Sequence, residues 1–399
     1  MLFQTFKANH RELFVVGGAV RDWLMGEEPK DFDLTTNALP EEMESWFVHT
    51  LDHGKHFGTI GVIINGQVFE ITTYRSDTNY KDGRHPENVH FGISVQEDVK
   101  RRDFTINGLL MDENGVIFDF VGGQEDIANK IVRTIGNPKE RFEEDRLRKW
   151  RCIRFATTKN MVIHHQTLQA IIDDPIFDGV SMERIREELN AILLSTKVGN
   201  GGRLLVETGM WQTLVQLGNS KGMTEIPLDQ IVLAFQRMET LPQNLEMRLV
   251  ILILTMEEGA DKAFLNFLKY STNCINRVLS QKKYFKADLN DEIEMKKTLA
   301  NLGIDQFWVQ IALRKCLDFG DQEGVLIKQW ENRAEEIFHN QDPLTLKDLD
   351  INGHDVLTMG YNGKSIAIAL ETALEYVYIY PQRNKKQVLL DYLKEKNHG

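Results

Sequence analysis

The chain has 399 residues, more than the roughly 100 to 200 of one ordinary domain, so we expect several compact units. Its apolar fraction of 42% is that of a globular protein, and no apolar run approaches the ~20 residues of a membrane-spanning helix. The formal net charge of -12 excludes a protein that coats nucleic acid through a uniformly basic surface, so any RNA site must be local.

The first residues of the chain, 1–11, show no basic segment followed by an apolar core and a cleavage site. We therefore expect no secretory signal and no membrane association, and a cytoplasmic protein. Three cysteines, Cys152, Cys274 and Cys316, have neither a zinc-site spacing nor a CxxC pair, and we interpret them as free, buried thiols.

Residues 1–136 mix β-branched or aromatic runs with turn signals and predict an α/β unit. Strands are expected at residues 13–16, 59–64, 68–74 and 116–120. Helices are expected to begin near Ala19, after the Gly17-Gly18 turn, and near Pro40. From Lys139 onward, apolar residues recur every three or four positions, which predicts a helical remainder. Its clearest amphipathic segments are residues 183–194, 228–238, 245–256 and 364–377.

The string at residues 13–34, LFVVGGAVRDWLMGEEPKDFDL, has parts that each suit a nucleoside triphosphate. Glycines let the backbone approach phosphates, and Arg21 can grip phosphate oxygens with a planar fork. Residues two apart in an extended segment point to the same side, so Asp31 and Asp33 can share a pair of magnesium ions. Two metals ~3.5 to 4 Å apart would activate an attacking 3′ hydroxyl and neutralise the leaving pyrophosphate.

Each of these elements alone has a simpler interpretation. The chain repeats Asp-x-Asp at Asp348-Leu349-Asp350, which we interpret as a helix start or a surface pair. Gly17-Gly18 by itself is a tight turn. Only the ordered combination of strand, glycines, arginine and carboxylates favours a nucleotide site.

Three later segments add charged residues. Glu70, in the β-type string VFEITTYR, can bring a third carboxylate to the pair, or face solvent as an ordinary strand residue. The segment at residues 82–86, DGRHP, is a polar loop. In RRDFTIN, Arg101 and Arg102 suit triphosphate or RNA phosphate, with a solvated charge cluster as the alternative.

Residues 144–156, EDRLRKWRCIRFA, are expected to form a helix with Asp145 and Arg148 on one face. Cytosine and adenine both present an amine donor beside a ring-nitrogen acceptor, which a carboxylate and a guanidinium can match. Uracil and guanine present the opposite pattern, and each unsatisfied buried group would cost about 1 to 3 kcal/mol. The alternative is an intrahelical ion pair. Arg151 and Arg154, further round the helix, can reach the triphosphate or the RNA.

This helix also lies in the most basic stretch that we single out. Residues 141–159 hold seven Lys or Arg and three Asp or Glu in an otherwise acidic protein. They are the candidate for a local RNA site.

The motifs GGAVRD, DFDLTT, EITTYR, DGRHP, RRDFTIN and EDRLRKWR follow one another in this order. With them the chain resembles the bacterial class II CCA-adding tRNA nucleotidyltransferases, relatives of poly(A) polymerases. The resemblance covers about the first 200 residues and returns faintly at residues 346–355 and 384–393. It implies template-independent addition of C, C and A to the 3′ end of tRNA from CTP and ATP, with Mg2+ as cofactor and pyrophosphate released.

The resemblance also implies an α+β fold with four parts. These are a polymerase-β-like catalytic head with a mixed sheet at residues 1–136, a helical neck at 137–202, a body at 203–325 and a tRNA-binding tail at 326–399. Carried over by position, Gly18 and Arg21 would bind the triphosphate, and Asp31 and Asp33 the magnesium. The incoming nucleotide would be bound by Arg102, Asp145, Arg148, Arg151 and Arg154. The chain departs from the family at Gly108, where alanine is usual, and at Arg146, where a small residue is usual.

Several alternatives stay open. A CC-only or A-only enzyme shares these motifs, although the loop at residues 82–85 resembles the element associated with switching from C to A. Poly(A) polymerases share the head but usually carry an Arg-rich string where this chain has GKHFG, and a basic C-terminal extension. His354-Asp355 and His164-His165 suggest an HD-type phosphohydrolase, and an inactive RNA-binding protein could keep the fold. The sequence names no protein partner.

Overall fold

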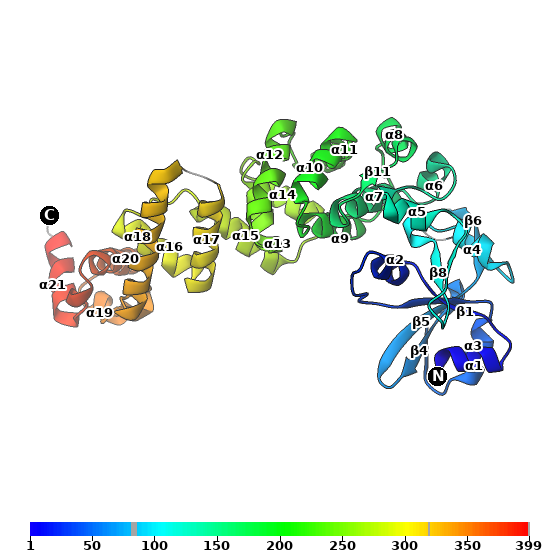
Figure 1. The fold of residues 1–399 in the computed structure, drawn as a ribbon. Helices are drawn as coiled ribbons and strands as arrows, with labels where there is room; N and C mark the ends of the chain where they lie inside the picture. The colour runs from blue at the N-terminus through cyan, green and yellow to red at the C-terminus, as the bar shows by residue number, and fades with distance from the viewer. Residues whose placement is uncertain (81–85, 318–319, 398–399) are drawn as a thin grey trace. The chain divides into compact units, whose positions relative to one another are not determined.

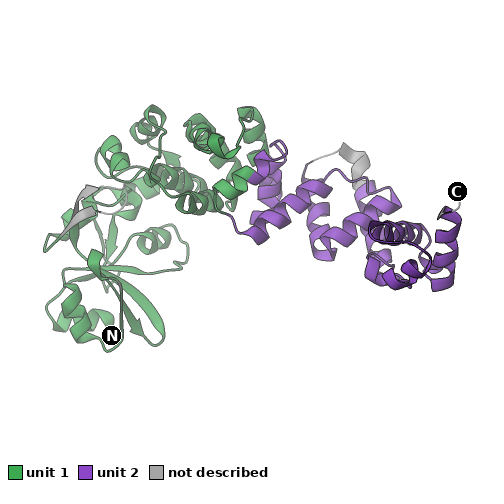
Figure 2. Cartoon of the chain, turned by 180° about the vertical axis from the view of Figure 1, so that it is seen from behind, with its two compact units in different colours: residues 1–236, 263–269 green, residues 237–262, 270–399 purple. Residues whose placement is uncertain are grey.

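The structure is a computed structural model that describes residues 1–80, 86–317 and 320–397. Its internal contacts divide the chain into two compact units, residues 1–236 with 263–269 and residues 237–262 with 270–399 (Figure 2). The boundaries predicted at residues 136, 202 and 325 are not tested by this division and stay predictions.

The first unit begins with a seven-stranded mixed sheet (Figure 1). Its order is β3-β4-β5-β2-β1-β8-β9, in which β2 and β5 pair in parallel and the other neighbours pair antiparallel. The strands are β1 (Leu13–Val16), β2 (Asp33–Thr36), β3 (Thr50–Gly54), β4 (Thr59–Ile64), β5 (Gln67–Thr73), β8 (Leu109–Met111) and β9 (Ile117–Asp119). The four predicted strands are therefore present, with ends that shift by a residue at two of them.

The short helices of this region lie against both faces of the sheet. They are α1 (Leu2–Ala8), α2 (Gly18–Leu24), α3 (Pro40–Trp46), α4 (Val95–Lys100) and α5 (Gly123–Ala128), with single 3-10 turns η1 (Lys55–Phe57) and η2 (Thr105–Asn107). Alternate residues of β1 face opposite sides. Val15 packs with Phe6 of α1 and Met43 of α3, whereas Val16 packs with Val99 of α4. Both faces of the sheet are thus covered by helices.

Two further strand pairs complete this region. Strand β6 (Arg75–Tyr80) pairs antiparallel with β7 (Pro86–Phe91). Of the loop predicted at residues 82–86, residues 82–85 lie outside the described residues and Pro86 begins β7. Parallel strands β10 (Ile131–Val132) and β11 (Val162–Ile163) pair with each other. Since β11 follows the first neck helices, the predicted all-helical neck gains one short strand.

The rest of the first unit is helical. Its helices are α6 (Pro138–Glu144), α7 (Leu147–Thr158), α8 (His165–Asp173), α9 (Met182–Leu193), α10 (Val198–Glu207), α11 (Met210–Gly218) and α12 (Leu228–Arg237), with a turn η3 (Asn219–Lys221) and most of α14 (Ala260–Phe267). The helices predicted at residues 183–194 and 228–238 correspond to α9 and α12. The α+β class is confirmed.

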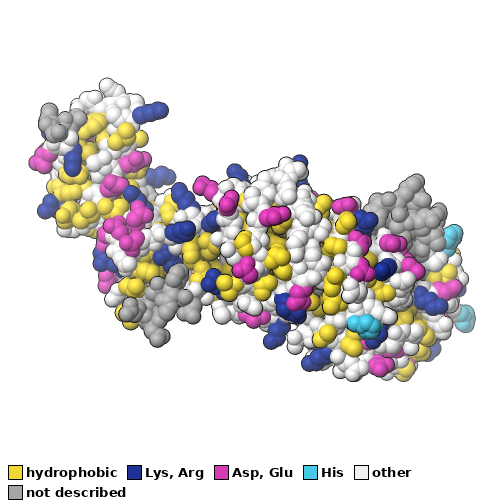
Figure 3. Space-filling view, turned by 90° about the horizontal axis from the view of Figure 1, so that it is seen from above, with side chains coloured by type: hydrophobic (Ala, Val, Ile, Leu, Met, Phe, Trp, Pro, Cys, Tyr) yellow, Lys and Arg dark blue, Asp and Glu magenta, His cyan; other side chains and the backbone are white. Residues whose placement is uncertain are grey.

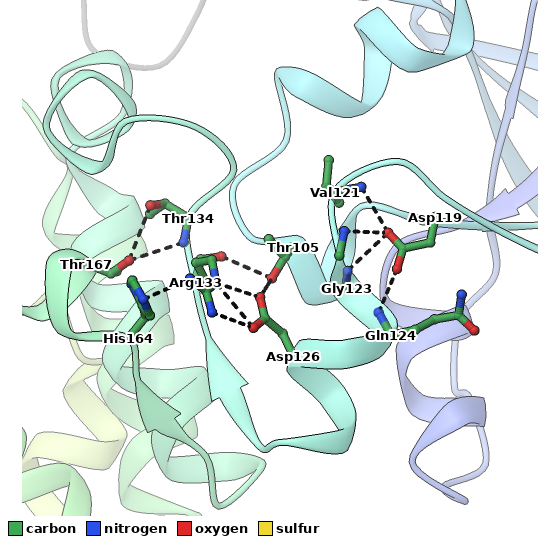
Figure 4. A network of polar contacts seen from close by, with 11 residues as sticks. Thr105, Asp119, Val121, Gly123, Gln124, Asp126, Arg133, Thr134, His164 and Thr167 are labelled. Carbon is green, nitrogen blue, oxygen red and sulfur yellow. Dashed lines mark hydrogen bonds and ion pairs between the residues drawn. The ribbon is translucent and has the colours of Figure 1, made fainter.

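A polar network connects α5 to β10, β11 and α8 (Figure 4). The Asp126 carboxylate accepts hydrogen bonds from the Thr105 hydroxyl at 2.6 Å and from Nε of Arg133 at 3.0 Å. Arg133 Nη1 lies 2.8 Å from His164 Nε2. Burial and the neighbouring Arg133 lower the pKa of His164, and because a guanidinium can only donate, the ring nitrogen accepts this bond. The network therefore fixes the head against the neck.

The second unit is entirely helical in the part of the chain that the structure describes. It contains η4 (Met238–Thr240), α13 (Leu245–Ile253), α15 (Thr272–Tyr284), α16 (Glu292–Leu302), α17 (Ile304–Cys316), α18 (Gly320–His339), η5 (Leu346–Asp348), α19 (Gly353–Thr358), α20 (Lys364–Ile379), η6 (Pro381–Arg383) and α21 (Lys386–Asn397). The predicted segments at residues 245–256 and 364–377 correspond to α13 and α20. Lys296 is fully buried in this unit and donates to Asp342 and to the Tyr378 carbonyl.

Three predictions from composition remain, on membrane-spanning helices, surface charge and the cysteines. Within the described ranges, no helix has both the length and the apolar character to cross a membrane. On the face drawn in Figure 3, Lys and Arg are interspersed with Asp and Glu, in keeping with the net charge of -12. All three cysteines are free, but only Cys152 is buried; Cys274 and Cys316 are partly exposed, which corrects the prediction for those two.

Candidate active site

The glycine turn between β1 and α2 has the conformation that its sequence predicts. Gly17 has φ 75° and ψ -126°, a region in which a side chain would be strained, and its N–H donates to the Leu109 carbonyl. Gly18 is the first residue of α2, and a Cβ added to it would lie 3.6 Å from Arg21 Nη2. The turn requires glycine at position 17, whereas the bare Gly18 leaves the backbone open beside the Arg21 guanidinium.

The predicted carboxylates lie at the start of β2 and beside it in the middle of β5. Asp33 is the first residue of β2, Asp31 lies two residues before it, and Glu70 of β5 is the parallel partner of Asp33. All three are exposed, and parallel partners project from the same face of a sheet. Among the described residues, none of the three carboxylates has a hydrogen bond or an ion pair.

Electrostatics at this end of the sheet favours the arrival of a cation. Partial burial raises the pKa of Asp33, the positive charge of Arg102 opposes that rise, and the negative charge of Asp31 adds to it. In the described part of the chain, no three His, Cys, Asp or Glu residues form a ready-made metal group. Two carboxylates still fit magnesium, because this ion takes one or two protein carboxylates together with water and substrate phosphates.

Arg102 lies between the glycine turn and Asp33. Its Nη2 donates to the buried carboxylate of Asp98 at 3.1 Å. A Cβ added to Gly17 would lie 3.8 Å from its Nη1, and its charge acts on the pKa of Asp33. The guanidinium is therefore held by α4 at the point where the glycine turn and the carboxylates meet.

A chain of polar contacts then leads from the head to α7. Arg21 Nη1 donates to Asn107 Oδ1 at 2.6 Å, and Asn107 Nδ2 donates to Asp103 Oδ1 at 3.0 Å. The second oxygen of Asp103 accepts from Arg151 Nε at 2.8 Å. Burial opposes ionisation, but Arg151 and the Asn107 amide lower the pKa of Asp103 to about 2. Arg21 and Arg151 are thus tied together through one ionised carboxylate.

The helix that carries Arg148, Arg151 and Arg154 starts later than predicted. Asp145 is extended, with φ -144° and ψ 103°, and α7 begins at Leu147. The reason is local: Asp145 Oδ1 accepts from the Leu147 N–H at 3.0 Å, a turn in which an Asp side chain competes with helical hydrogen bonding. Asp145 and Arg148 are therefore not neighbours on a helical face.

The two predicted base-reading residues are held by other partners. Asp145 Oδ2 accepts from Arg184 of α9 at 2.9 Å, which replaces the alternative ion pair with Arg148. Arg148 is buried and donates to Glu144 and to the carbonyls of Arg101 and Arg141. Its bond to Arg101 connects α7 directly to the segment that carries Arg102, so the carboxylate end of the sheet and the start of α7 belong to one region.

Sequence reasoning missed the residues that orient these side chains. Asp103 and Asn107 lie inside the motif RRDFTIN, of which only the two arginines were predicted to bind phosphate. Glu188 and Arg184 lie on α9, and their contacts with Arg154 and Asp145 span more than thirty residues of chain. A local sequence pattern does not show which distant residues form such pairs. The positive charge of the basic stretch predicts only that acidic residues lie opposite it.

Known families match the two parts of this region. Residues 13–133 match the poly A polymerase head domain, and residues 160–218 match a family described as the probable RNA and SrmB-binding site of polymerase A. The chain is also 31% identical to the CCA-adding enzyme of Bacillus velezensis over 396 residues, 98% of this chain and 96% of that protein. The chain belongs to the CCA-adding enzyme family. Membership implies nucleotidyl transfer that uses divalent metal ions.

Other CCA-adding enzymes support this assignment. The enzyme of Geobacillus kaustophilus is 41% identical over 214 residues, 53% of each chain. The crystal structure of the Bacillus stearothermophilus CCA-adding enzyme in complex with CTP has a TM-score of 0.82 at 29% identity, covering 100% of this chain and 96% of that one. The Thermotoga maritima CCA-adding enzyme complexed with tRNA has a TM-score of 0.64 at 20% identity, which shows a shared fold alone.

The two departures from the CCA-adding enzyme family lie beside the site rather than in it. A Cβ on Gly108 would lie 2.9 Å from Val121 Cγ2 and 3.0 Å from Ile135 Cδ1, so the glycine suits a closely packed core. Arg146 precedes α7, is partly exposed, and lies 4.0 Å from Asp178. Neither residue belongs to the contacts between the carboxylates and α7.

The residues behind the rival interpretations have structural partners. Asp355 accepts from the Asn352 N–H at the start of α19 and pairs with Lys386 at 2.6 Å. In the second Asp-x-Asp, Asp348 caps η5 through Thr345 and Asp350 accepts from the Lys386 N–H. These carboxylates shape helix starts, as predicted for the Asp348 pair.

Proposed function

We propose that this chain adds C, C and A to the 3′ end of tRNA, with CTP and ATP as substrates, no nucleic-acid template, and pyrophosphate as the second product. The observation that carries the proposal is the continuity of one site. The contacts from Arg21 to Arg151 and from Arg148 to Arg101 join the helix after the glycine turn, and the segment that carries Arg102, to α7. The charge of Arg102 in turn acts on Asp33. Since the substrate is tRNA, we place the reaction in the cytoplasm.

Asp31 and Asp33 would hold Mg2+, with Glu70 beside them on the same face of the sheet. Bound there, two divalent ions would lower the pKa of the attacking 3′ hydroxyl and neutralise the charge that develops on pyrophosphate. The exposed oxygens of these carboxylates, which have no hydrogen bond or ion pair among the described residues, support the assignment.

The triphosphate would be bound by the open backbone at Gly18 and by four guanidiniums, Arg21, Arg102, Arg151 and Arg154. Arginine suits this role because its planar fork can give two parallel hydrogen bonds to phosphate oxygens. Each guanidinium is already held by a carboxylate, from Asp22, Asp98, Asp103 and Glu188 respectively. Their positions are therefore set before the nucleotide arrives, which reduces the entropy lost on binding.

Asp145 and Arg148 would read the base. A carboxylate has about four acceptor positions, and the bonds from Leu147 and Arg184 fix its orientation while leaving positions for an exocyclic amine. Arg148 uses its two Nη1 hydrogens and one Nη2 hydrogen on the protein, which leaves Nε and the second Nη2 hydrogen for a ring nitrogen. A fixed acceptor and a fixed donor of this kind accept C and A but present the wrong partners to U and G.

A transfer assay tests the proposal. The purified chain is incubated with Mg2+, tRNA that lacks its CCA end, and labelled CTP or ATP, and the product ends are sequenced. The proposal predicts tRNA ending in C, C and A. Products ending in CC, or A added only to tRNA that already ends in CC, would identify the partial enzymes. A long A tract would identify a poly(A) polymerase, and no extension would leave a phosphohydrolase or an inactive RNA-binding protein.

A further inference from the structure

One aromatic ring lies beneath three of the guanidiniums of the site. Phe155 is on α7 and is 3% exposed. The guanidinium carbons of Arg154, Arg21 and Arg151 lie 4.0, 4.9 and 5.5 Å from its ring centre. Arg21 comes from α2 of the head, whereas the other two come from α7. A single ring therefore collects cations from two elements that are far apart in sequence.

The contact is electrostatically favourable. The face of a phenyl ring carries negative charge density and attracts a cation within about 6 Å, more strongly where water is excluded. Each guanidinium is also bound to a carboxylate, Arg21 to Asp22 at 2.7 Å and Arg151 to Asp103 at 2.7 Å, with Glu188 bound to Arg154. Ring and carboxylates together fix the orientation of three side chains that are otherwise long and flexible.

A second aromatic ring, that of Phe104, holds Phe155 in place. Phe104, fully buried in the segment that follows Arg102, meets Phe155 edge to face, with ring centres 5.7 Å apart and planes at 77°. In this geometry the positive edge of one ring meets the negative face of the other, so Phe104 holds the tilt of Phe155. Phe104 thus links the ring to the same segment that holds Asp103 and Asn107.

We infer that Phe155 is a positioning residue whose ring gathers Arg21, Arg151 and Arg154 into a pre-arranged cradle for the triphosphate. The inference rests on the proposed function and deepens it. Phe155 is covered by the guanidiniums and acts through them, so its effect falls on the phosphates that CTP and ATP share. It should therefore alter the affinity for both nucleotides equally and leave the choice between them unchanged.

A simpler role, filling space in the core, predicts a different dependence. A space-filling residue is sensitive to volume, whereas a cation-binding ring is sensitive to the charge density on its face. Ring fluorination withdraws that charge density and changes the volume little. Phenylalanine analogues with one, two and three ring fluorines at position 155 therefore separate the two roles without removing the side chain.

The experiment measures the affinity of each variant for CTP and ATP by calorimetry, then KM and kcat in the transfer assay. We expect affinity to fall stepwise with each fluorine, by roughly 3- to 30-fold over the series. KM should rise by the same factor for both nucleotides, with kcat within about twofold and the melting temperature nearly constant. Phe155→Leu, which keeps an apolar side chain but no ring, should weaken both nucleotides at least as much.

Phe177 is the matched control. It is fully buried and meets Trp150 of α7 edge to face at 5.5 Å, and over its ring the described residues place no cation. The same fluorinated series at Phe177 should leave nucleotide affinity unchanged. Equal affinities across the series at Phe155, or an equal loss at Phe177, would overturn the inference. If the unmodified chain extends no tRNA, the proposed function fails instead, whatever the binding series shows.

Discussion

In the described part of the chain, the cationic half of the candidate site (Arg21, Arg151 and Arg154) has partners within the protein, whereas the anionic half (Asp31 and Asp33) has none. Arg21, Arg151 and Arg154 each have a carboxylate partner and share the ring of Phe155. Asp31 and Asp33 have no such partners among the described residues, and their mutual repulsion contributes to the raised pKa of Asp33. The cationic half thus has partners within the protein, whereas we propose that the anionic half gains its partner when it binds a cation.

This difference separates affinity from chemistry. A pre-arranged cationic half binds the triphosphate with little loss of conformational freedom, and binding of this kind sets KM. An anionic half that needs a cation acts on the charge developing in the transition state, which sets kcat. Substitutions in the two halves should therefore have distinct kinetic effects, and the following variants test that separation.

The largest effect is expected at the carboxylates. Asp31→Ala or Asp33→Ala should lower kcat by about 1,000-fold or more, because metal ions contribute several kcal/mol and each 1.36 kcal/mol is tenfold in rate. Binding of tRNA and CTP should change little. The second Asp-x-Asp provides the control: Asp350→Ala removes a carboxylate from the same sequence pattern and should leave kcat unchanged. Near-normal turnover in both head variants would reject the metal assignment.

The next effect concerns the choice of base. Asp145→Ala and Arg148→Ala should each reduce the preference for CTP and ATP over UTP and GTP by about 5- to 150-fold, the value of 1 to 3 kcal/mol. Competition among all four triphosphates, read by sequencing of the added residues, measures it. Arg146→Ala, which removes a partly exposed guanidinium next to the same turn, should retain full selectivity. Unchanged selectivity in both variants would contradict the base-reading assignment.

The ion pair between Asp103 and Arg151 should contribute to stability as well as to the position of Arg151. Asp103→Asn should lower the free energy of unfolding by about 2 to 3 kcal/mol at neutral pH, somewhat less than for a fully buried pair because Arg151 is partly exposed. Since the pKa of Asp103 is lowered from 3.8 to about 2, this stability is present above pH 3.8 and lost as pH falls toward 2. Denaturant unfolding at several pH values measures it.

The matched variant for that pair is Asp173→Asn, at a surface pair with Lys139. It should change the free energy of unfolding by less than about 0.5 kcal/mol. A similar loss of unfolding free energy in the two variants would mean that the buried pair of Asp103 stabilises the protein no more than a surface pair does. A pH-independent loss for Asp103→Asn would mean that the pair is not ionic.

A smaller effect of opposite sign is expected at Asp33. A carboxyl whose pKa is raised on folding destabilises the protein above the unfolded pKa of 3.8, because the folded state must ionise it at a cost. Asp33→Asn should therefore raise the melting temperature by about 1 to 3 °C at neutral pH, while catalysis is lost. Differential scanning calorimetry should show this gain shrinking toward pH 4 and in the presence of Mg2+ with CTP. A lower melting temperature at pH 7 would show that folding does not raise the pKa of Asp33.

The smallest effect is expected at Gly108, where this chain differs from its family and which belongs to neither half of the site. Gly108→Ala restores the residue usual in the family but should destabilise this chain by about 1 kcal/mol, because its methyl would crowd Val121 and Ile135. Turnover should not change. The double variant Gly108→Ala, Val121→Ala should recover part of the stability in the same unfolding measurement, since it removes the crowded methyl groups.

The fold was largely predictable from local patterns. Alternation and turn signals placed β1, β4, β5 and β9, and apolar spacing placed the main helices, because these features depend on residues close together in the chain. The start of α7 was not predicted correctly. There one side chain, Asp145, takes the Leu147 N–H and delays the helix. Single hydrogen bonds of this kind decide boundaries that periodicity leaves undefined.

For the proposed site, sequence motifs named the residues but not the partners that hold them. The carboxylates, the glycine turn and the arginines could be named from motifs. The basic stretch at residues 141–159 stays a candidate for a local RNA site, but its motif did not show that some of its cations have distant acidic partners: Lys149 pairs with Asp174, and Lys159 with Asp22 at 2.8 Å. Which acid meets which cation depends on tertiary packing, and a sequence pattern does not contain it.

Metal binding tests the central claim most directly, that Asp31 and Asp33 are the cation-dependent half of the site. Mn2+, which prefers carboxylate and phosphate oxygens as Mg2+ does, can be titrated by electron paramagnetic resonance into the chain saturated with CTP. We predict tight binding by the unaltered chain and at least tenfold weaker binding by the double variant Asp31→Ala, Asp33→Ala, with CTP affinity largely retained. Equal Mn2+ affinity and stoichiometry in the two proteins would contradict the account.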